Sequence, residues 1–362
     1  MTLSPVFRSP SAVRLLQEEG IWDHLAPAIR SQAEAVAAIH EDLTHLLDEA
    51  FRAPSPVLPD SDDPMGPNSL PFLQEYFFLI LFRSLFESLG VTPERLRLYA
   101  EVNFCVKGTI TAADNLFDDQ AKSLLPLDTG RGSRFLSILQ LMCFERLIRR
   151  SLDRGLDRGE LGPVERDAIL KGLLDMMGRI GRLEGSEEGG VTEIPTPEQM
   201  INSVHRVRGG ALFALSFIAP RVLERGEALE RLNAAEPAVA RLGTAFQIVD
   251  DLTDFEFDVG RRSHNLLVSQ IHHHGSAEEK ALLRDLLEGG EARHDHVEGA
   301  FRNSARAVLD RAYAEARRSF ALLAELGFWF PERLADEVVH AIVGLEGVRR
   351  MEDIAAEATS GS

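Results

Sequence analysis

The helical spacing of its apolar residues limits the fold of this chain more than any other feature of the sequence. Leucine and alanine, with glutamate and arginine between them, recur three and four positions apart over nearly all of the 362 residues. Valine, isoleucine and threonine do not gather in the short alternating runs that are typical of β-strands. The 44% of hydrophobic residues is enough for a sizeable core. We therefore predict an all-α protein.

Proline and glycine divide this helical sequence into segments. An N-terminal helical segment over residues 1–52 leads into a proline-rich linker or loop over 53–71, because closely spaced prolines cannot continue a helix. A large helical domain over 72–357 and a short tail over 358–362 follow. Within the large domain we expect a loop over 184–197 and a helix that begins at about residue 93 and runs to the first of the two acidic clusters described below. The other helices are expected over about 72–89, 133–158, 163–183, 198–224, 228–258, 277–289, 291–326 and 331–357.

The charge balance argues against general binding to nucleic acid or to an anionic membrane. Lysine and arginine total 39 against 57 acidic residues, so the formal net charge is −18. An anionic substrate would have to be held locally, by metal ions or by a few placed arginines.

Cysteine usage and hydropathy point to a cytoplasmic protein without stable membrane insertion. The chain contains only Cys105 and Cys143, which excludes a disulfide framework and a thiolate metal site and fits a reducing compartment. The N-terminus lacks the apolar core of a signal peptide. The longest strongly apolar run, residues 76–82, is far too short to cross a bilayer.

Two acidic clusters lie inside apolar, helical sequence. The first, Asp114 to Asp119, reads DNLFDD, and the second, Asp250 to Asp254, reads DDLTD. Each places carboxylates at i and i+4, which stacks them on one face of a helix, where like charges repel. A single cluster of this kind can simply be a solvated face. Two of them suggest a bound cation, and Mg²⁺ shared with substrate phosphates suits such oxygen ligands.

The second cluster carries a resemblance to a known family. Residues 243–254 read GTAFQIVDDLTD, with the pattern FQxxDDxxD, and residues 207–216 read VRGGALFALS. With the first cluster, these segments resemble the trans-isoprenyl diphosphate synthases and the wider class I isoprenoid synthase superfamily. The resemblance runs from about residue 72 to residue 275. It implies a single-domain helical bundle around a deep apolar cavity, with an acidic helix on each side of its mouth.

The resemblance also implies a set of site residues, an allylic isoprenyl diphosphate as substrate and three Mg²⁺ ions. Asp114, Asp118, Asp250 and Asp254 would be the catalytic aspartates. The metal-binding set would comprise Asp114, Asp118, Asp119, Asp250, Asp251 and Asp254, although Asp251 is expected to stand behind the direct ligands. Arg206, Arg208, Arg261 and Arg262 would bind the leaving diphosphate, since guanidinium groups match phosphate oxygens. A homodimer is a further expectation that comes from the family.

Departures from the family pattern favour a reaction of one substrate. Elongating members carry a basic motif where this chain reads LPFLQ, residues 70–74, and an arginine pair after the first cluster, where only Lys122 remains. Asn115 also replaces an acid within the first cluster. We therefore expect a terpene synthase that cyclises or rearranges one allylic diphosphate. The alternatives are an elongating or head-to-head prenyltransferase and a non-catalytic partner subunit.

Two further groups of polar residues, three histidines and two arginines, are not expected to form a metal or diphosphate site. His272, His273 and His274 are consecutive, so on a helix they point about 100° apart and cannot converge on one ion. We expect Arg349 and Arg350 at an exposed helix end, with a role at the diphosphate as the alternative.

Overall fold

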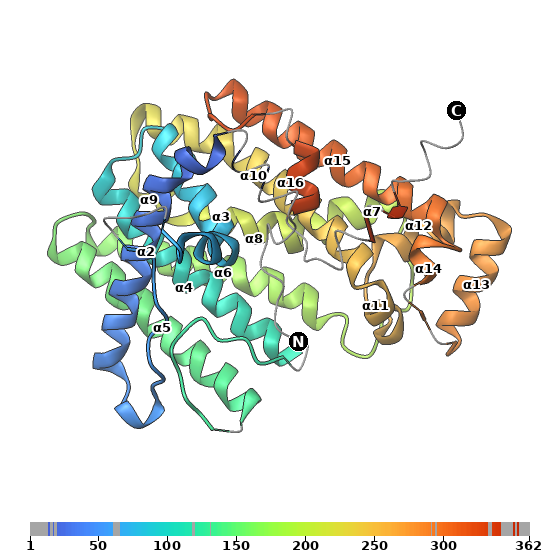
Figure 1. The fold of residues 1–362 in the computed structure, drawn as a ribbon, viewed down its shortest axis with the longest axis horizontal. Helices are drawn as coiled ribbons and strands as arrows, with labels where there is room; N and C mark the ends of the chain where they lie inside the picture. Colours follow the sequence, from blue (N-terminus) through green and yellow to red (C-terminus); the bar gives the residue numbers. More distant parts are fainter. Residues whose placement is uncertain are drawn as a thin grey trace. The chain divides into compact units, whose positions relative to one another are not determined.

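A computed structural model describes the chain with helices alone. It covers residues 14, 17, 20–60, 66–117, 120–130, 132–290, 292–293, 295–331, 335–341, 350–351 and 353–354. Over these residues there is no β-strand, and a single isolated bridge joins Arg52 to Leu127. The prediction of an all-α protein is confirmed (Figure 1).

The described residues fall into two compact units. The first draws on Leu15–Leu173 and Leu215–Asn233, and the second on Leu174–Ala214 and Ala234–Ser362. Two helices, α6 (Pro163–Gly185) and α10 (Gly226–Thr253), contribute residues to both units. The division predicted from the sequence, with boundaries after residues 52 and 71, remains a prediction.

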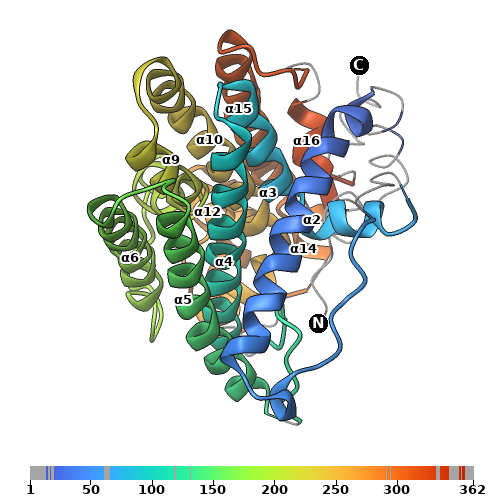
Figure 2. The ribbon, with the colours of Figure 1, turned by 90° about the vertical axis from the view of Figure 1, so that its left-hand side faces the viewer.

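Helix α4 forms the centre of the first unit. This unit contains α2 (Ile21–Leu46), η1 (Glu49–Phe51), α3 (Ser69–Ser88), α4 (Pro93–Phe117), α5 (Ser133–Asp157), η3 (Leu215–Phe217) and α9 (Ile218–Leu223). α4 packs against α2, α3 and α5, and these helices lie side by side in Figure 2. The ring of Phe144 fills the space left by Gly108, where an added Cβ would lie 2.0 Å from the ring. A helix interior accepts this glycine because the aromatic ring replaces the missing side chain.

A buried polar network also ties α2, α4 and α5 together. Glu101 of α4 is 2% exposed, and its Oε2 accepts a hydrogen bond of 2.6 Å from Arg154 of α5. Arg154 also pairs with Asp42 of α2, to which Arg150 donates at 3.1 Å. Removing one member would leave another charge buried without its partner, so the network fixes the register of the three helices.

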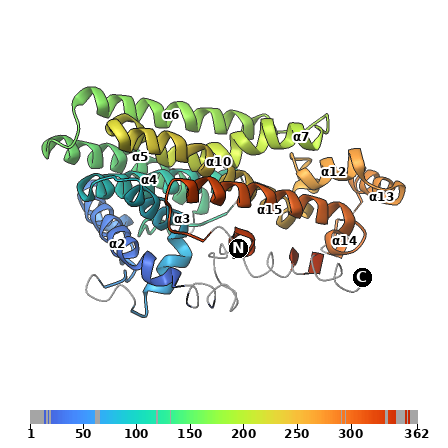
Figure 3. The same ribbon diagram turned by 90° about the horizontal axis from the view of Figure 1, so that it is seen from above.

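Apart from the long helix α15 (Arg302–Glu325), the second unit consists of short helices around the C-terminal part of α10. They are α7 (Pro197–Gln199), the π-helix η2 (Met200–Gly210), α8 (Ala211–Ala214), α11 (Phe255–Arg261), α12 (Leu266–His274), α13 (Ala277–Leu287), α14 (Asp295–Glu298) and α16 (Ala335–Ala341). α15 packs against α12, α14 and α16 (Figure 3). The hydroxyl of Ser319 in α15 donates to the Ala238 carbonyl of α10 at 2.7 Å.

Several predicted helices differ from those observed. The segment 198–224 is not one helix but a succession of α, π and 3₁₀ pieces, because Gly209 and Gly210 allow a close contact with α10. The helix predicted to end near residue 258 ends at Thr253, and α11 follows it. The sequence analysis missed α12, which begins where the Asn265 side chain accepts hydrogen bonds from Leu267 N and Val268 N.

None of the helices in the described part of the chain has the length and apolar character needed to cross a membrane.

Candidate metal and diphosphate site

The second acidic cluster lies where α10 ends. Asp250 and Asp251 belong to its last turn, and Asp254 occupies the junction with α11. Asp254 N donates to the Asp250 carbonyl at 2.8 Å, so the helical turn continues between these two residues. Asp250 is half-buried and Asp254 is exposed. Their i and i+4 spacing therefore holds on the backbone, and both carboxylates can accept a ligand from one side.

Gln247 orients the first of these carboxylates. Its Nε2 donates to Asp250 Oδ2 at 3.1 Å, and its side chain is buried one turn before the cluster. The preceding residue, Phe246, faces the ring of Phe213 with 6.0 Å between the centroids. These contacts explain why phenylalanine and glutamine precede the aspartates: one anchors the helix and the other directs a carboxylate.

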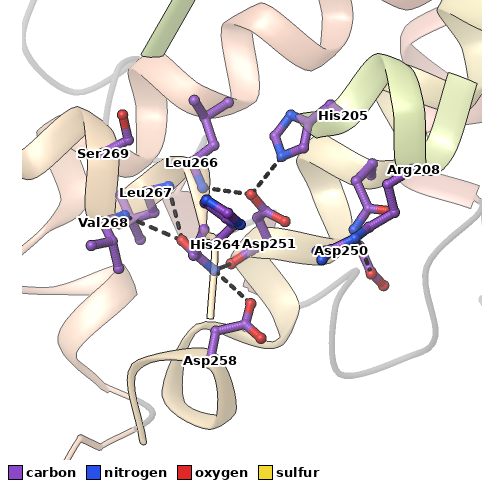
Figure 4. A network of polar contacts seen from close by, with 12 residues as sticks. His205, Arg208, Asp250, Asp251, Asp258, His264, Leu266, Leu267, Val268 and Ser269 are labelled. Atoms are coloured by element: carbon purple, nitrogen blue, oxygen red, sulfur yellow. Dashed lines mark hydrogen bonds and ion pairs between the residues drawn. The ribbon is translucent and has the colours of Figure 1, made fainter. Parts of the chain in front are cut away.

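Asp251 points into the protein. Its side chain is 2% exposed, and its Oδ2 accepts a hydrogen bond from Leu266 N at 2.5 Å. His205 Nε2 lies 2.8 Å from the same oxygen (Figure 4). The sequence analysis did not single out His205, and no local pattern distinguishes it from an ordinary core histidine. The role of Asp251 as a metal ligand stays a prediction.

Asp258 extends the cluster by one more turn. Burial raises the pKa of its carboxyl well above the usual value, and the negative charges of Asp251, Asp254 and Asp250 raise it further. The Asn265 side chain opposes this shift by donating to Asp258 Oδ2 at 2.9 Å. Proton uptake by Asp258 would lower the repulsion within the acidic group.

Arg208 is held by two glutamates, Glu184 in the last turn of α6 and Glu187 just after this helix. Its Nε lies 2.5 Å from Glu184 Oε1, and one terminal nitrogen donates to Glu187 Oε1 at 2.6 Å. Burial disfavours the charge of Arg208, but these carboxylates raise the pKa of its guanidinium above the usual value. Asp251 and Asp258 raise it as well, which shows that Arg208 is within electrostatic reach of the acidic cluster.

Glu187 also receives hydrogen bonds from His264. The His264 ring nitrogen Nδ1 lies 2.5 Å from Glu187 Oε1, and His264 N donates to Oε2 at 3.2 Å. Burial alone would raise the pKa of Glu187, but these hydrogen bonds and the charge of Arg208 lower it below the usual value. The sequence analysis treated this segment only as a loop.

The other three predicted arginines have surroundings that differ from those of Arg208. Arg206 is exposed, and no ion pair with another described residue involves its side chain. Arg261 lies over the Phe257 ring at 4.9 Å. Arg262 ends α11 in a left-handed conformation, with φ of 55°, and donates to the Leu287 carbonyl at 3.0 Å. Their roles at the diphosphate stay predictions.

Arg350 lies at the cluster, contrary to the expectation of an exposed helix end. Its side chain is 5% exposed and donates to the Leu252 carbonyl at 2.7 Å, at the end of α10. It also donates to Glu256 Oε1 at 2.7 Å and to Glu298 Oε1 at 2.6 Å. The cation offsets the negative end of the helix dipole, which the sequence could not reveal because the two residues are 98 positions apart. Arg349 lies outside the described residues.

The first acidic cluster belongs to the first unit and ends α4. Asp114 is exposed, whereas Asn115 is 1% exposed. The Asn115 amide donates to the Lys122 carbonyl at 2.8 Å and accepts from Lys122 N at 3.3 Å. The asparagine that departs from the family pattern therefore holds the loop that follows the cluster. Asp118 and Asp119 lie outside the described residues.

The described carboxylates fit Mg²⁺ that is shared with a substrate. Among the described residues, no group of three histidine, cysteine, aspartate or glutamate side chains is close enough to bind a metal by itself. Mg²⁺ is commonly held by one or two carboxylates together with phosphate oxygens and water. Asp250 and Asp254, one turn apart and accessible, match this arrangement. His273 is engaged elsewhere, since its Nε2 lies 3.1 Å from the Ile194 carbonyl.

Comparison with solved structures identifies the fold. A decaprenyl diphosphate synthase from Rhodobacter capsulatus matches with a TM-score of 0.59 and 19% identity, over 88% of this chain and 99% of the synthase. A polyprenyl synthase from Roseobacter denitrificans matches with a TM-score of 0.53 and 18% identity, over 92% of this chain and 98% of the synthase. A geranylgeranyl pyrophosphate synthetase from Pyrococcus horikoshii matches with a TM-score of 0.50 and 13% identity, over 93% of this chain and 98% of the synthetase. No protein-family model and no curated protein sequence matches the chain.

The chain therefore has the class I isoprenoid synthase fold.

Proposed function

We propose that this protein catalyses the Mg²⁺-dependent ionisation of an allylic isoprenyl diphosphate. The observation that carries the proposal is the pair Asp250 and Asp254 at the end of α10, accessible and one turn apart, on a fold shared with prenyl diphosphate synthases. Mg²⁺ bound there would offset the charge that develops on the departing diphosphate.

Residues around the pair have distinct roles in this proposal. Asp250 and Asp254 supply oxygen ligands, while Gln247 fixes the orientation of Asp250. Arg208 binds diphosphate oxygens, because a guanidinium group offers paired donors that match them. The anion would exchange with Glu184 and Glu187, which now occupy these donors.

The carbocation formed by ionisation can react in two ways. Transfer to a second isoprenoid substrate is favoured by the fold neighbours, whose names describe decaprenyl, polyprenyl and geranylgeranyl diphosphate synthases. We place this trans-prenyl transfer first, whereas the sequence alone ranked cyclisation first.

Cyclisation is the second candidate, and a contact in the first unit favours it. The first turn of α3 contains no basic residue, and Lys107 of α4 contacts Glu75 in the following turn. Its Nζ donates to the Glu75 carbonyl at 3.1 Å and to Glu75 Oε1 at 3.2 Å. Lys107 is thus a single lysine, already paired with Glu75, where the sequence pattern of elongating enzymes would place a basic motif for the diphosphate of a second substrate.

A product assay distinguishes the two fates. Purified protein with Mg²⁺ is incubated with geranyl, farnesyl or geranylgeranyl diphosphate, with and without isopentenyl diphosphate, and the products are identified by mass spectrometry. Longer diphosphates that require isopentenyl diphosphate would establish prenyl transfer. Hydrocarbon or alcohol from one allylic substrate would establish cyclisation. If no allylic substrate releases diphosphate, the proposed function is wrong.

The metal assignment predicts a strong effect of Asp250→Asn. The amide keeps the size of the side chain but removes the charge that binds Mg²⁺, so diphosphate release should slow by about 100-fold or more. Asp157→Asn, at an exposed position of α5, is the matched control and should retain the wild-type rate. Circular dichroism of both variants checks that helicity is retained, and an Asp250→Asn variant with normal Mg²⁺-dependent turnover would refute the assignment.

A further inference from the structure

A fully buried histidine faces the second acidic cluster from the π-helix η2. His205 is 0% exposed, and its Nε2 lies 2.8 Å from Asp251 Oδ2. Since a carboxylate only accepts hydrogen bonds, the ring nitrogen donates. The other ring nitrogen, Nδ1, is buried and has no hydrogen-bond partner among the described residues. The contact with Asp251 is thus the polar interaction that holds this ring.

Hydrogen bonds to Asp251 link three elements, α10, η2 and α12. Its Oδ2 accepts from His205 in η2 and from Leu266 N at the start of α12. Its main-chain carbonyl accepts from the Asn265 side chain at 2.7 Å, and the same amide nitrogen donates to Asp258. Figure 4 shows His205, Leu266 and Asp258 arranged around Asp251. The carboxylate therefore joins the end of α10 to η2 and α12.

The backbones of η2 and α10 come close enough for this contact at a pair of glycines. An added Cβ on Gly209 would lie 2.2 Å from the Gly243 carbonyl oxygen, and one on Gly243 would lie 2.2 Å from the Gly209 carbonyl oxygen. From Gly209 back to His205, η2 runs antiparallel to α10 from Gly243 to Asp251. A π-helix of this length is rare, and π-helical turns occur often at functional sites.

The side chains of neighbouring helical residues point about 100° apart, so fixing Asp251 also fixes Asp250. Asp251 faces the interior, while Asp250 is half-buried beside Gln247 and Asp254 is exposed. A rotation of the last turn of α10 about its axis would turn both outward carboxylates away from a shared ion. The hydrogen bond from His205 resists that rotation.

We propose that His205 is a positioning residue that acts through Asp251 to orient Asp250 and Asp254 for Mg²⁺ and diphosphate. This inference rests on the proposed function and deepens it. His205 itself touches neither the metal nor the substrate. Groups that orient metal ligands from behind commonly change metal affinity by about tenfold or more when they are lost.

Two polar substitutions of His205 test the proposal. In His205→Gln the amide nitrogen reaches about as far as Nε2 and can donate to Asp251, whereas the shorter His205→Asn side chain cannot. We expect His205→Asn to raise the Mg²⁺ concentration for half-maximal diphosphate release by about tenfold. His205→Gln should return it to within about threefold of the wild type. The rate at saturating Mg²⁺ should change less than the half-maximal concentration.

A binding measurement gives a readout that does not depend on turnover. The melting temperature is followed as Mg²⁺ is titrated in the presence of inorganic pyrophosphate, and the titration midpoints should follow the same order as the kinetic ones. The matched control is His40→Asn, since His40 of α2 is also a buried histidine with an unpartnered ring nitrogen. It should leave the Mg²⁺ midpoint unchanged, even if the protein is less stable.

The outcomes separate this inference from the proposed function. Equal Mg²⁺ midpoints for wild type and His205→Asn would overturn the positioning role while the metal site stands. An equal increase in His205→Asn, His205→Gln and His40→Asn would also overturn it, because it would indicate general destabilisation. If the wild type itself shows no response to Mg²⁺ with pyrophosphate, the proposed metal site fails and this inference fails with it.

Discussion

At the scale of single residues, Asn115 shows how a departure from a family pattern can have an internal cause. Its amide uses both a donor and an acceptor on the Lys122 backbone. Gln140 of α5 completes the arrangement by donating to the same Lys122 carbonyl at 2.8 Å and accepting from Leu124 N at 3.0 Å. Two side-chain amides thus form hydrogen bonds with the backbone groups of Lys122 and Leu124, in the loop that follows Asp114. A carboxylate could not donate to the Lys122 carbonyl.

Asn115→Asp should therefore destabilise the protein, although it brings the first cluster closer to the family pattern. It replaces a donor by a buried negative charge that faces a carbonyl oxygen, at an estimated cost of about 2 kcal/mol. Urea unfolding measures this difference, with Asn303→Asp at an exposed position of α15 as the control, for which we expect a change within about 0.5 kcal/mol. Equal stability of wild type and Asn115→Asp would show that the amide is not needed as a donor.

At the scale of helices, the crossing of η2 and α10 brings side chains of the candidate site from separate segments together. Gly209 and Gly243 allow contact between the two backbones, and Gly210 lies against Ala240 and Thr244. The sequence of neither helix alone predicts that the two backbones come into contact. The glycines looked like a local feature of the GGALF segment, whereas their contacts are with residues 30 or more positions away.

Gly243→Ala should separate the two helices. The new Cβ would meet a backbone oxygen, which cannot move as a side chain can, so we expect destabilisation of about 1–3 kcal/mol and a weaker Mg²⁺ response. Gly181→Ala in α6 is the matched control, because an added Cβ meets nothing within 4 Å there. This control should be neutral or stabilise the helix by up to about 1 kcal/mol. Thermal unfolding of both variants would contradict the argument if Gly243→Ala were as stable as the control.

The helices that follow a strong local pattern were predictable from the sequence. α3, α4, α5 and α6 agree with the predicted ranges to within a few residues, because each begins near a proline, glycine or cap and carries apolar residues at helical spacing. The π-helix and α12 were not predictable, since η2 depends on a tertiary contact and α12 is short. At the candidate site, the spacing and the family resemblance predicted Asp250 and Asp254 as metal ligands. His205, Glu187 and Arg350 contribute through long-range contacts that leave no local signal.

At the scale of the whole molecule, a formal charge of −18 makes stability sensitive to pH, and one buried group has a defined part in this. Burial raises the pKa of Glu101 from 4.5 to about 7, even though Arg154 donates to it. The folded protein therefore binds the Glu101 proton more tightly than the unfolded chain does. Its contribution to stability is full below pH 4.5 and is lost as the pH rises towards 7.

Glu101→Gln should remove this part of the pH dependence. Between pH 5 and pH 8, the unfolding free energy of the wild type should fall relative to that of the variant by a few kcal/mol, on the order of 1.4 kcal/mol for each unit of pKa shift. Urea unfolding at four pH values gives the difference. Glu145→Gln, at an exposed ion pair of α5, should run parallel to the wild type. Parallel curves for Glu101→Gln as well would show that Glu101 titrates normally.

Arg350 ties the order of synthesis to the completion of the second acidic cluster. The hydrogen bond from its guanidinium to the Leu252 carbonyl joins residues 98 positions apart. While the chain emerges from the ribosome, Asp250 and Asp251 are made long before this cation exists. A nascent chain that stops short of residue 350 has the carboxylates of the cluster without the arginine that caps their helix. The cation that caps this end of α10 is thus translated 98 residues after the carbonyl that it caps.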